Sequence, residues 1–308
     1  MAESSKLWIF GIIIVIVLLI ISMFLAGLIT LFIGGAETGP IGGSVAIIPV
    51  KGAIVADSAG GIFGIQEAVS TDIVEMIEKA DKNQLIQAIV FEINSPGGSA
   101  VASEEIVNAI SKTEKPTVAW VREVGASGGY WVASAADHIV ASRMSIVGSI
   151  GVVSSYLEFE GLMEKYGVKY RRLVAGEYKD IGSPFKEMTN EENKLLQKRL
   201  DEMHYYFIDS IVKNRNLADN EKQEISKASI YTGTEALQLG LIDEIGSLDE
   251  VTAYLERERN IKAEYTEYVK KRTFLESLGQ VFSSFSFNVG KGIGEGMFNT
   301  ENDLKVYS

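Results

Sequence analysis

The sequence contains no cysteine and only two histidines among its 308 residues. Without cysteine the chain can form no disulfide, present no thiolate nucleophile and offer no thiolate ligand to a metal ion. The two histidines, His138 and His204, leave almost no basis for a zinc site built on imidazole ligands. We therefore expect no metal and no cofactor, and any catalysis has to use hydroxyls, carboxylates, lysines or backbone amides.

Basic side chains are also in short supply. Lys and Arg number 29 against 41 Asp and Glu, which gives a formal net charge of −12 at pH 7. Nucleic-acid binding requires clustered Lys and Arg that neutralise phosphates, so this composition argues against a nucleic-acid partner. Hydrophobic residues make up 46% of the chain, which is enough for a sizeable core in one or two domains.

Charge is absent altogether from Leu7 to Ile33, a run of 27 residues. A helix of this length, at about 1.5 Å per residue, exceeds the roughly 30 Å hydrocarbon core of a bilayer. We expect residues 1–33 to form a transmembrane anchor, because a cleavable signal peptide would need a shorter apolar region and a small-residue cleavage site. Lys6 precedes the run and Glu37 is the first charge after it. The positive-inside rule then predicts a single-pass protein of the cell membrane whose remaining chain lies outside the cytoplasm.

Residues 34–44 are a Gly-rich tether by composition, and an alternation of strands and helices follows it. The β-branched run from Val45 predicts a strand, and apolar residues at helical spacing predict a helix over Gln66–Lys82. The rhythm then repeats, with strands expected at 85–93, 116–121, 138–142, 148–155 and 168–174, and helices at 103–112, from 127 and at 159–167. This alternation is typical of an α/β domain with a largely parallel sheet, which we assign to residues 45–260.

The pattern becomes helical from Asn190. One face of a long predicted helix carries a stripe of apolar residues, namely Leu196, Leu200, Met203, Phe207 and Ile211. Residues 232–251 predict a helix, a turn and another helix. Residues 261–308 form a C-terminal tail with a Phe- and Ser-rich stretch, which we expect to be weakly ordered or to contact a neighbouring subunit or the membrane.

Small residues surround a single hydroxyl in Gly125–Gly129, where Ser127 follows a predicted strand and opens a predicted helix. The unpaired amides of a helix start would stabilise an oxyanion on a carbonyl that Ser127 attacks. An ordinary helix N-cap explains an isolated serine of this kind equally well. A second Gly-rich turn, with Gly97 and Gly98, also joins a strand to a helix and could offer another amide at the same sheet edge. Its ordinary alternative is turn geometry alone.

A serine nucleophile needs a base. We expect His138 to begin the strand after the Ser127 helix, at the far end from the Ser127 turn, and His204 to be solvated or packed on the long helix. Lys179 lies in a predicted loop. A lysine acts as a general base only when it is neutral, so its pKa must fall from about 10.4 to about 7–8, for example by desolvation. The ordinary alternative for any single lysine is a solvated surface charge.

Four segments taken together resemble the signal peptide peptidase A family, a group of membrane-anchored Ser/Lys peptidases of bacteria and archaea. In the family's order and spacing, they are Asn94–Gly98, Gly125–Asp137, Gly148–Val153 and Gly176–Phe185. The resemblance extends from about Val45 to Tyr254. It implies a crotonase/Clp-protease-like α/β fold.

The resemblance also implies a role for each matching residue. Ser127 would be the nucleophile, Lys179 the general base and Ser149 the hydroxyl that orients the lysine. The oxyanion would be held by amides at Gly97, Gly98 and Gly128. The substrates would be signal peptides left in the bilayer and other short unfolded peptides. The chain would assemble into a homo-oligomeric ring on the membrane, with a neighbour completing each site.

Three alternatives stay open. Peptidases of the stomatin-operon type share the dyad but act on a defined membrane-protein partner, and their extra spans and small β-barrel domain are not recognisable in this sequence. Enzymes of the crotonase fold hold a thioester enolate with paired amides and no serine nucleophile, which the anchor and Ser127 argue against. A non-catalytic membrane scaffold is disfavoured by the presence of both Ser127 and Lys179.

Overall fold

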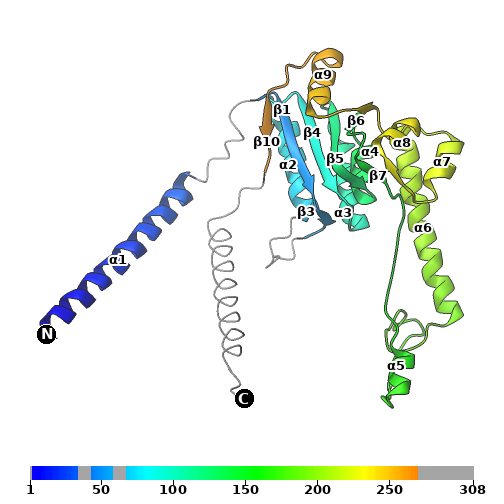
Figure 1. The fold of residues 1–308 in the computed structure, drawn as a ribbon, viewed down its shortest axis with the longest axis horizontal. Helices are drawn as coiled ribbons and strands as arrows, with labels where there is room; N and C mark the ends of the chain where they lie inside the picture. Colours follow the sequence, from blue (N-terminus) through cyan, green and yellow to red (C-terminus); the bar gives the residue numbers. More distant parts are fainter. Residues whose placement is uncertain (1, 34–42, 58–66, 270–308) are drawn as a thin grey trace, which may run out of the picture. The chain divides into compact units, whose positions relative to one another are not determined.

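The computed structural model describes residues 2–33, 43–57 and 67–269 (Figure 1). The first range is one helix, α1 (Ala2–Ile33), which contains the uncharged run. Within the part of the chain whose side chains are described, no helix has both the length and the apolar character needed to cross a bilayer. The transmembrane anchor therefore stays a prediction. Most of the tether and the Phe-rich part of the tail fall outside the described residues.

The other two ranges form an α/β domain around an eight-stranded sheet with the order β10-β1-β4-β5-β6-β9. Strand β7 pairs with β5 and with β8, and β2 and β3 form a separate two-stranded sheet. Every pairing is parallel except that of β7 with β8, which confirms the predicted largely parallel sheet. The strands are β1 (Val45–Lys51), β2 (Ala53–Val55), β3 (Glu67–Val69), β4 (Ala88–Ser95), β5 (Thr117–Ala126), β6 (His138–Ala141), β7 (Ile146–Gly148), β8 (Ile230–Thr232), β9 (Glu244–Ile245) and β10 (Tyr265–Glu267).

The central strands are buried on both faces, as expected for parallel strands covered by helices. Along β4, Phe91 and Ile93 point into one core and Val90 into the other, because successive side chains alternate across a strand. Helices α2 (Ser70–Lys82), α3 (Ala100–Ile110) and α4 (Gly128–Ser134) contribute to the first core, and α9 (Leu248–Glu258) covers the second. The remaining helices of the domain are α5 (Glu160–Lys165), α6 (Asn190–Arg215), α7 (Asp219–Ile225) and α8 (Gly233–Gln238).

Several predicted boundaries were wrong, and each has a physical reason. The helix expected from Gln66 begins at Ser70, because residues 67–69 pair with β2 instead. The strand expected over 148–155 ends at Gly148, because its partner β5 ends opposite it at Ala126. No strand forms over 168–174, where the described backbone pairs with no other strand. The sheet continues past the predicted domain end at residue 260, because β10 pairs with β1.

Residues 149–189, which we call the arm, leave the sheet after β7 and end at the start of α6. Figure 1 shows α5 and the beginning of α6 lying away from the sheet. The arm exposes many large apolar side chains, including Val153, Leu157, Leu162, Tyr166, Val168 and Leu173. Its end is fixed by a capping box at Thr189 and Glu192, and by an ion pair of 2.6 Å between Lys186 and Glu192. The arm is thus anchored to α6, yet its apolar surface has no cover within the described chain.

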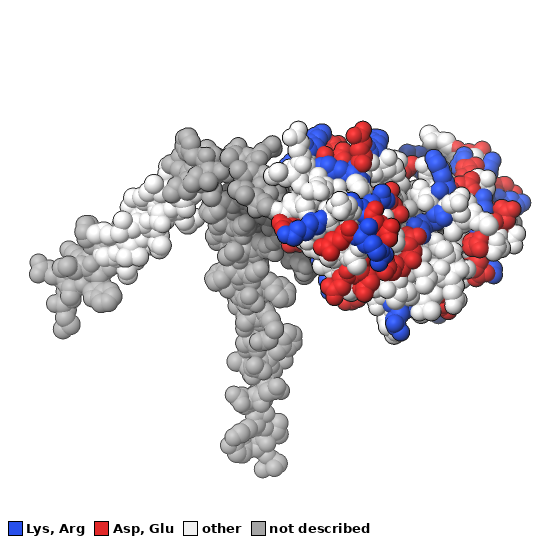
Figure 2. All heavy atoms as spheres, turned by 90° about the horizontal axis from the view of Figure 1, so that it is seen from above, with Lys and Arg blue, Asp and Glu red and all other residues white. Residues whose placement is uncertain are grey.

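Helix α6 confirms the long predicted helix, although only two of the five residues in its apolar stripe are buried. Phe207 and Ile211 lie in the core, Met203, one turn before Phe207, is 44% exposed, and Leu196 and Leu200 are partly buried. The stripe therefore runs out of the core toward the arm. Figure 2 shows acidic and basic side chains interspersed over the face of the domain seen from above.

Candidate active site

Ser127 lies at a sharp turn between β5, which ends at Ala126, and α4, which begins at Gly128. Its backbone angles are φ 51° and ψ −125°, a conformation normally reserved for glycine. A serine held this way at a strand-to-helix turn, in the pattern G-x-S-x-G, matches the nucleophile elbow of serine hydrolases, which projects the hydroxyl from the sheet edge. The Ser127 N–H is held by the Gly148 carbonyl at 2.7 Å. The turn is therefore more than an ordinary helix N-cap, and the Ser127 side chain makes no capping hydrogen bond.

The glycines around Ser127 are required by close packing. A Cβ atom on Gly128 would lie 2.2 Å from Ser103 Oγ, and one on Gly129 would lie 2.5 Å from the Ser95 carbonyl oxygen. No side chain fits at either position, because α4 starts directly against α3 and the end of β4. The small residues thus allow the backbones of α4, α3 and β4 to lie close together, and they also allow the sharp turn at Ser127.

The second Gly-rich turn runs directly beside Ser127. A Cβ on Gly97, whose φ is +97°, would lie 2.8 Å from the Ser127 Cβ and 2.7 Å from the Gly128 nitrogen. Gly98 is fixed by its neighbours, since Ile54 donates its N–H to the Gly97 carbonyl at 2.9 Å and accepts from the Ser99 N–H at 2.8 Å. The sequence expectation that the two turns meet at one edge of the sheet is therefore met in the structure.

Two backbone amides at this meeting point have no acceptor among the described residues, those of Gly98 and Gly128. The Gly98 nitrogen lies 3.5 Å from the position that a Gly128 Cβ would take, so the two residues lie close together. The Gly97 N–H, by contrast, donates to Ser95 Oγ at 3.1 Å and is occupied in this structure. The arrangement provides two amide donors near Ser127, which an oxyanion hole would require.

Ser149 lies next to this centre through the backbone. It follows Gly148, whose carbonyl accepts from the Ser127 N–H, and it has φ 53°. Its own N–H donates to the Ser229 carbonyl at 2.8 Å. The structure thus brings Ser127, Ser149 and the Gly97–Gly98 turn together.

Lys179 is the predicted site residue that the structure does not bring to Ser127. It lies in the arm, in a turn closed by its N–H on the Gly176 carbonyl at 3.2 Å, and it is exposed. Beside it, Arg172 binds Asp180 at 2.9 Å, and this hydrogen bond lowers the pKa of the Asp180 carboxyl. Among the described residues, no hydrogen bond or ion pair joins the Lys179 side chain to either serine.

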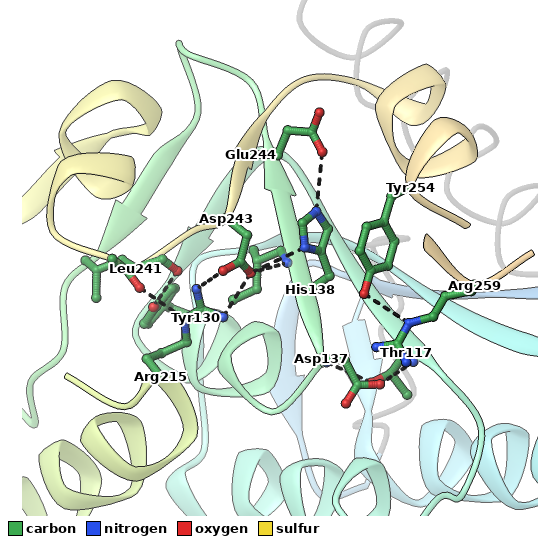
Figure 3. A network of polar contacts seen from close by, with 12 residues as sticks. Thr117, Tyr130, Asp137, His138, Arg215, Leu241, Asp243, Glu244, Tyr254 and Arg259 are labelled. Carbon is green, nitrogen blue, oxygen red and sulfur yellow. Dashed lines mark hydrogen bonds and ion pairs between the residues drawn. The ribbon is translucent and has the colours of Figure 1, made fainter. Parts of the chain in front are cut away.

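His138 lies at the opposite end of the sheet from Ser127, as predicted. It begins β6 and is paired with Val118 near the start of β5, whereas Ser127 follows the end of that strand. Its ring stacks on Tyr254 with centroids 3.8 Å apart, and Nε2 lies 3.4 Å from Glu244 Oε2 (Figure 3). Among the described residues, no group of three or more His, Cys, Asp or Glu side chains is placed to hold a metal ion.

A buried polar network next to His138 fixes the far side of α4. The Tyr130 hydroxyl donates to the Leu241 carbonyl at 2.7 Å, and Arg215 binds Asp243 through both terminal nitrogens, at 3.0 and 2.6 Å (Figure 3). Complete burial of Tyr130 raises the pKa of its hydroxyl well above the usual value. The network ties the helix that starts at Ser127 to the loop before β9.

His204 has a contact that the sequence did not predict. Its Nε2 lies 3.0 Å from the Ile150 carbonyl, one residue after Ser149. The available signal was its position in the apolar stripe of α6, where a polar residue that faces the core needs a partner. The same helix also bonds α4, since Trp131 Nε1 donates to Ser210 Oγ at 2.8 Å and Asn214 Nδ2 to Ser134 Oγ at 3.0 Å.

Comparison with known families gives two overlapping matches. Residues 109–262 match "Peptidase family S49", and residues 62–151 match "Clp protease". The second match agrees with the Clp-protease-like α/β fold that the sequence predicted.

Similar proteins carry related names. The chain is 35% identical over 244 residues to "Putative protease MJ0651" of Methanocaldococcus jannaschii, covering 78% of each chain. It is 29% identical over 228 residues to "Putative signal peptide peptidase SppA" of Enterococcus faecium, covering 73% of this chain and 66% of that protein. Among solved structures, a mutant of a membrane-bound stomatin-specific protease with a substrate peptide aligns over 80% of this chain and all of the other, with 16% identity and a TM-score of 0.47.

Proposed function

The chain belongs to peptidase family S49 and is a serine peptidase, and from this premise we propose that Ser127 and Lys179 form its catalytic dyad. In the proposed reaction, neutral Lys179 removes the proton from Ser127 Oγ as that oxygen attacks the peptide carbonyl. The lysine ammonium then protonates the leaving amine, and water hydrolyses the acyl-enzyme by the reverse sequence. Ser149 accepts or donates a hydrogen bond at Nζ and orients the lysine.

The elbow at Ser127 is the observation that carries this proposal. Its strained backbone supports a role for Ser127 as nucleophile, and the Gly98 and Gly128 amides, which have no described acceptor, support an oxyanion hole beside it. A thioester enolate site would use the two amides but would give no reason for a serine in a conformation that glycine adopts more easily. This difference favours acyl transfer over the enolate alternative.

We propose that Lys179 reaches Ser127 from a neighbouring copy of the chain in a homo-oligomer. Two observations support this arrangement. The arm that carries Lys179 exposes its apolar side chains, and the apolar stripe of α6 is only partly covered toward it. A second copy that covers this surface would also desolvate Lys179, and desolvation favours the neutral form of a lysine.

Signal peptides and other short unfolded segments are the substrates that we propose. The name of the Enterococcus faecium relative and the predicted anchor at residues 1–33 support a substrate in or near the membrane. On the same grounds we propose a single-pass cell-membrane protein with an extracytoplasmic catalytic domain. A defined membrane-protein substrate, as for peptidases of the stomatin-operon type, is the second candidate, because the predicted anchor would bring the domain equally close to it.

Cleavage of a quenched fluorescent apolar peptide by the full chain in mild detergent tests the dyad. Ser127→Ala and Lys179→Ala should each lose activity by at least a thousandfold, whereas His138→Gln should stay within about twofold of the wild type. Mixing the two inactive variants during assembly should restore part of the activity, because some sites then combine an intact serine with an intact lysine. An active Lys179→Ala variant would contradict the dyad, and inactivity of the mixture despite shared oligomers would contradict the contribution from a neighbour.

A further inference from the structure

We propose that His204 is a positioning residue of the active site, which holds the Ser149 turn in place through the Ile150 carbonyl. The inference rests on the proposed dyad, since it assigns a task to Ser149. It concerns a residue on α6 whose described polar contact is with the Ile150 backbone.

The path from His204 to Ser127 consists of short backbone steps. His204 Nε2 lies 3.0 Å from the Ile150 oxygen, and Ile150 is fully buried. One residue earlier, Ser149 donates its N–H to Ser229, and one residue before that, the Gly148 carbonyl accepts from the Ser127 N–H at 2.7 Å. A shift of the Ile150 peptide would therefore move Ser149 and pull on the elbow itself.

The Ser149 turn needs such support because the sheet ends there. Strand β7 has three residues, and its pairing with β5 stops at Gly148. Beyond it the chain leaves for the arm, and Ser149 has a φ of 53°, which a non-glycine residue adopts only when neighbours enforce it. Ser149 donates its N–H to the Ser229 carbonyl and accepts from the Gly151 N–H at 2.9 Å, and the His204 bond holds the next peptide, at Ile150.

The hydrogen bond to the Ile150 carbonyl determines which ring nitrogen of His204 carries a proton. A carbonyl oxygen only accepts hydrogen bonds, so Nε2 of His204 must carry the proton. A glutamine at this position also presents an N–H donor at a similar reach, whereas a phenylalanine keeps the shape of the ring and offers none. The pair of variants therefore separates the hydrogen bond from the packing.

Helix α6 contacts two parts of the proposed active site. Through Ser210 and Asn214 it holds α4, the helix that starts behind Ser127, and through His204 it holds the turn with Ser149. One helix thus contacts both the helix that follows Ser127 and the turn that holds Ser149. Its N-terminal end carries the arm with Lys179, so the same helix links all three proposed site residues.

Steady-state kinetics of the full chain with the fluorescent peptide test the assignment. His204→Phe should lower kcat about tenfold, the effect of one lost hydrogen bond of ordinary strength, with KM unchanged within twofold. His204→Gln should restore kcat to within about twofold of the wild type. In hydrogen exchange, residues 146–153 should exchange faster in His204→Phe and regain protection in His204→Gln.

Each outcome is decisive for the positioning role. If His204→Phe keeps full kcat, or if His204→Gln is as slow as His204→Phe while both fold and assemble like the wild type, the role is refuted. Should His204→Phe fail to fold, His204→Met takes its place as the variant without a donor, with the same expected loss. Failure of the dyad is seen separately, as activity in Ser127→Ala with His204 intact.

Discussion

Replacing Ser127 by glycine should make the protein more stable than replacing it by alanine, although both variants should be inactive. The backbone angles of Ser127, φ 51° and ψ −125°, place its Cβ in steric conflict with the chain, and glycine has no Cβ. Alanine retains the conflict, while glycine removes it. The comparison therefore measures the conformational strain at the proposed nucleophile.

The expected difference is about 1.3 kcal/mol in favour of the glycine variant. A non-glycine residue in such a conformation costs about 1–3 kcal/mol. Against this, glycine has a more flexible unfolded chain, which costs about 0.4–1 kcal/mol relative to alanine. The net gain of about 1.3 kcal/mol would raise the melting temperature by about 3–5 °C for a domain of this size.

Urea unfolding and thermal melting of both variants in the same detergent supply the measurement. Ser111 is the matched control, because it is exposed, lies at the end of α3 and has ordinary helical angles of φ −65° and ψ −15°. At that position alanine should be the more stable by about 0.5–1 kcal/mol, the reverse of the order at Ser127. If Ser127→Gly is no more stable than Ser127→Ala, the elbow is unstrained and the reasoning fails.

Three further predictions concern stability. Gly128→Ala should cost about 1–3 kcal/mol in urea unfolding, because its Cβ would lie 2.2 Å from Ser103 Oγ, and Ser103→Ala should recover most of that loss when combined with it; equal losses in the single and double variants would contradict the clash. Arg215→Met should cost about 2–3 kcal/mol by the same assay, less than for a fully buried pair, because its side chain is 7% exposed and that of Asp243 is 32% exposed. The hydrogen bond from Lys186 lowers the pKa of the Glu192 carboxyl. Ionised Glu192 therefore stabilises the start of α6 above about pH 4.5, and this stabilisation is lost as the pH falls through the folded-state pKa. Hydrogen exchange at the start of α6 should therefore accelerate between pH 6 and pH 3, after correction for intrinsic rates, and Glu192→Gln should remove most of that dependence.

The sheet and the elbow were largely predictable from the sequence. Buried parallel strands carry continuous β-branched runs, and such runs marked β1, β4, β5 and β6 with errors of a few residues at their ends. The two Gly-rich turns were also found, because close backbone approach excludes side chains. Their meeting at one sheet edge follows from the parallel arrangement of the strands that precede them.

The arm was not predictable by the same signals. Residues 168–174 have strand-like composition, yet they pair with no strand of the described chain. The composition of a segment does not show whether a partner strand lies beside it. The exposed position of Lys179 has the same origin. His204 was overlooked because a single polar residue in an apolar stripe does not indicate which distant carbonyl it will meet.

The apolar stripe of α6 shows the limit most clearly. Its regular spacing predicted one buried face along the whole helix, and the spacing is present in the structure. Burial nevertheless stops between Phe207 and Met203, where the helix passes beyond the sheet. Sequence periodicity identifies the apolar face of a helix, but which segment or subunit buries that face depends on tertiary or quaternary structure.

The pairing of β1 with β10 has a consequence for synthesis of the chain. Val45 lies opposite Tyr265, so the two strands are separated by 220 residues. At about 5–20 residues per second, a ribosome takes roughly 10–40 s to produce β10 after β1 has emerged. During that interval the outer edge of β1 lacks its partner and can accept a strand from another nascent chain. The last strand of the domain therefore completes the fold and also closes an edge that would otherwise favour aggregation.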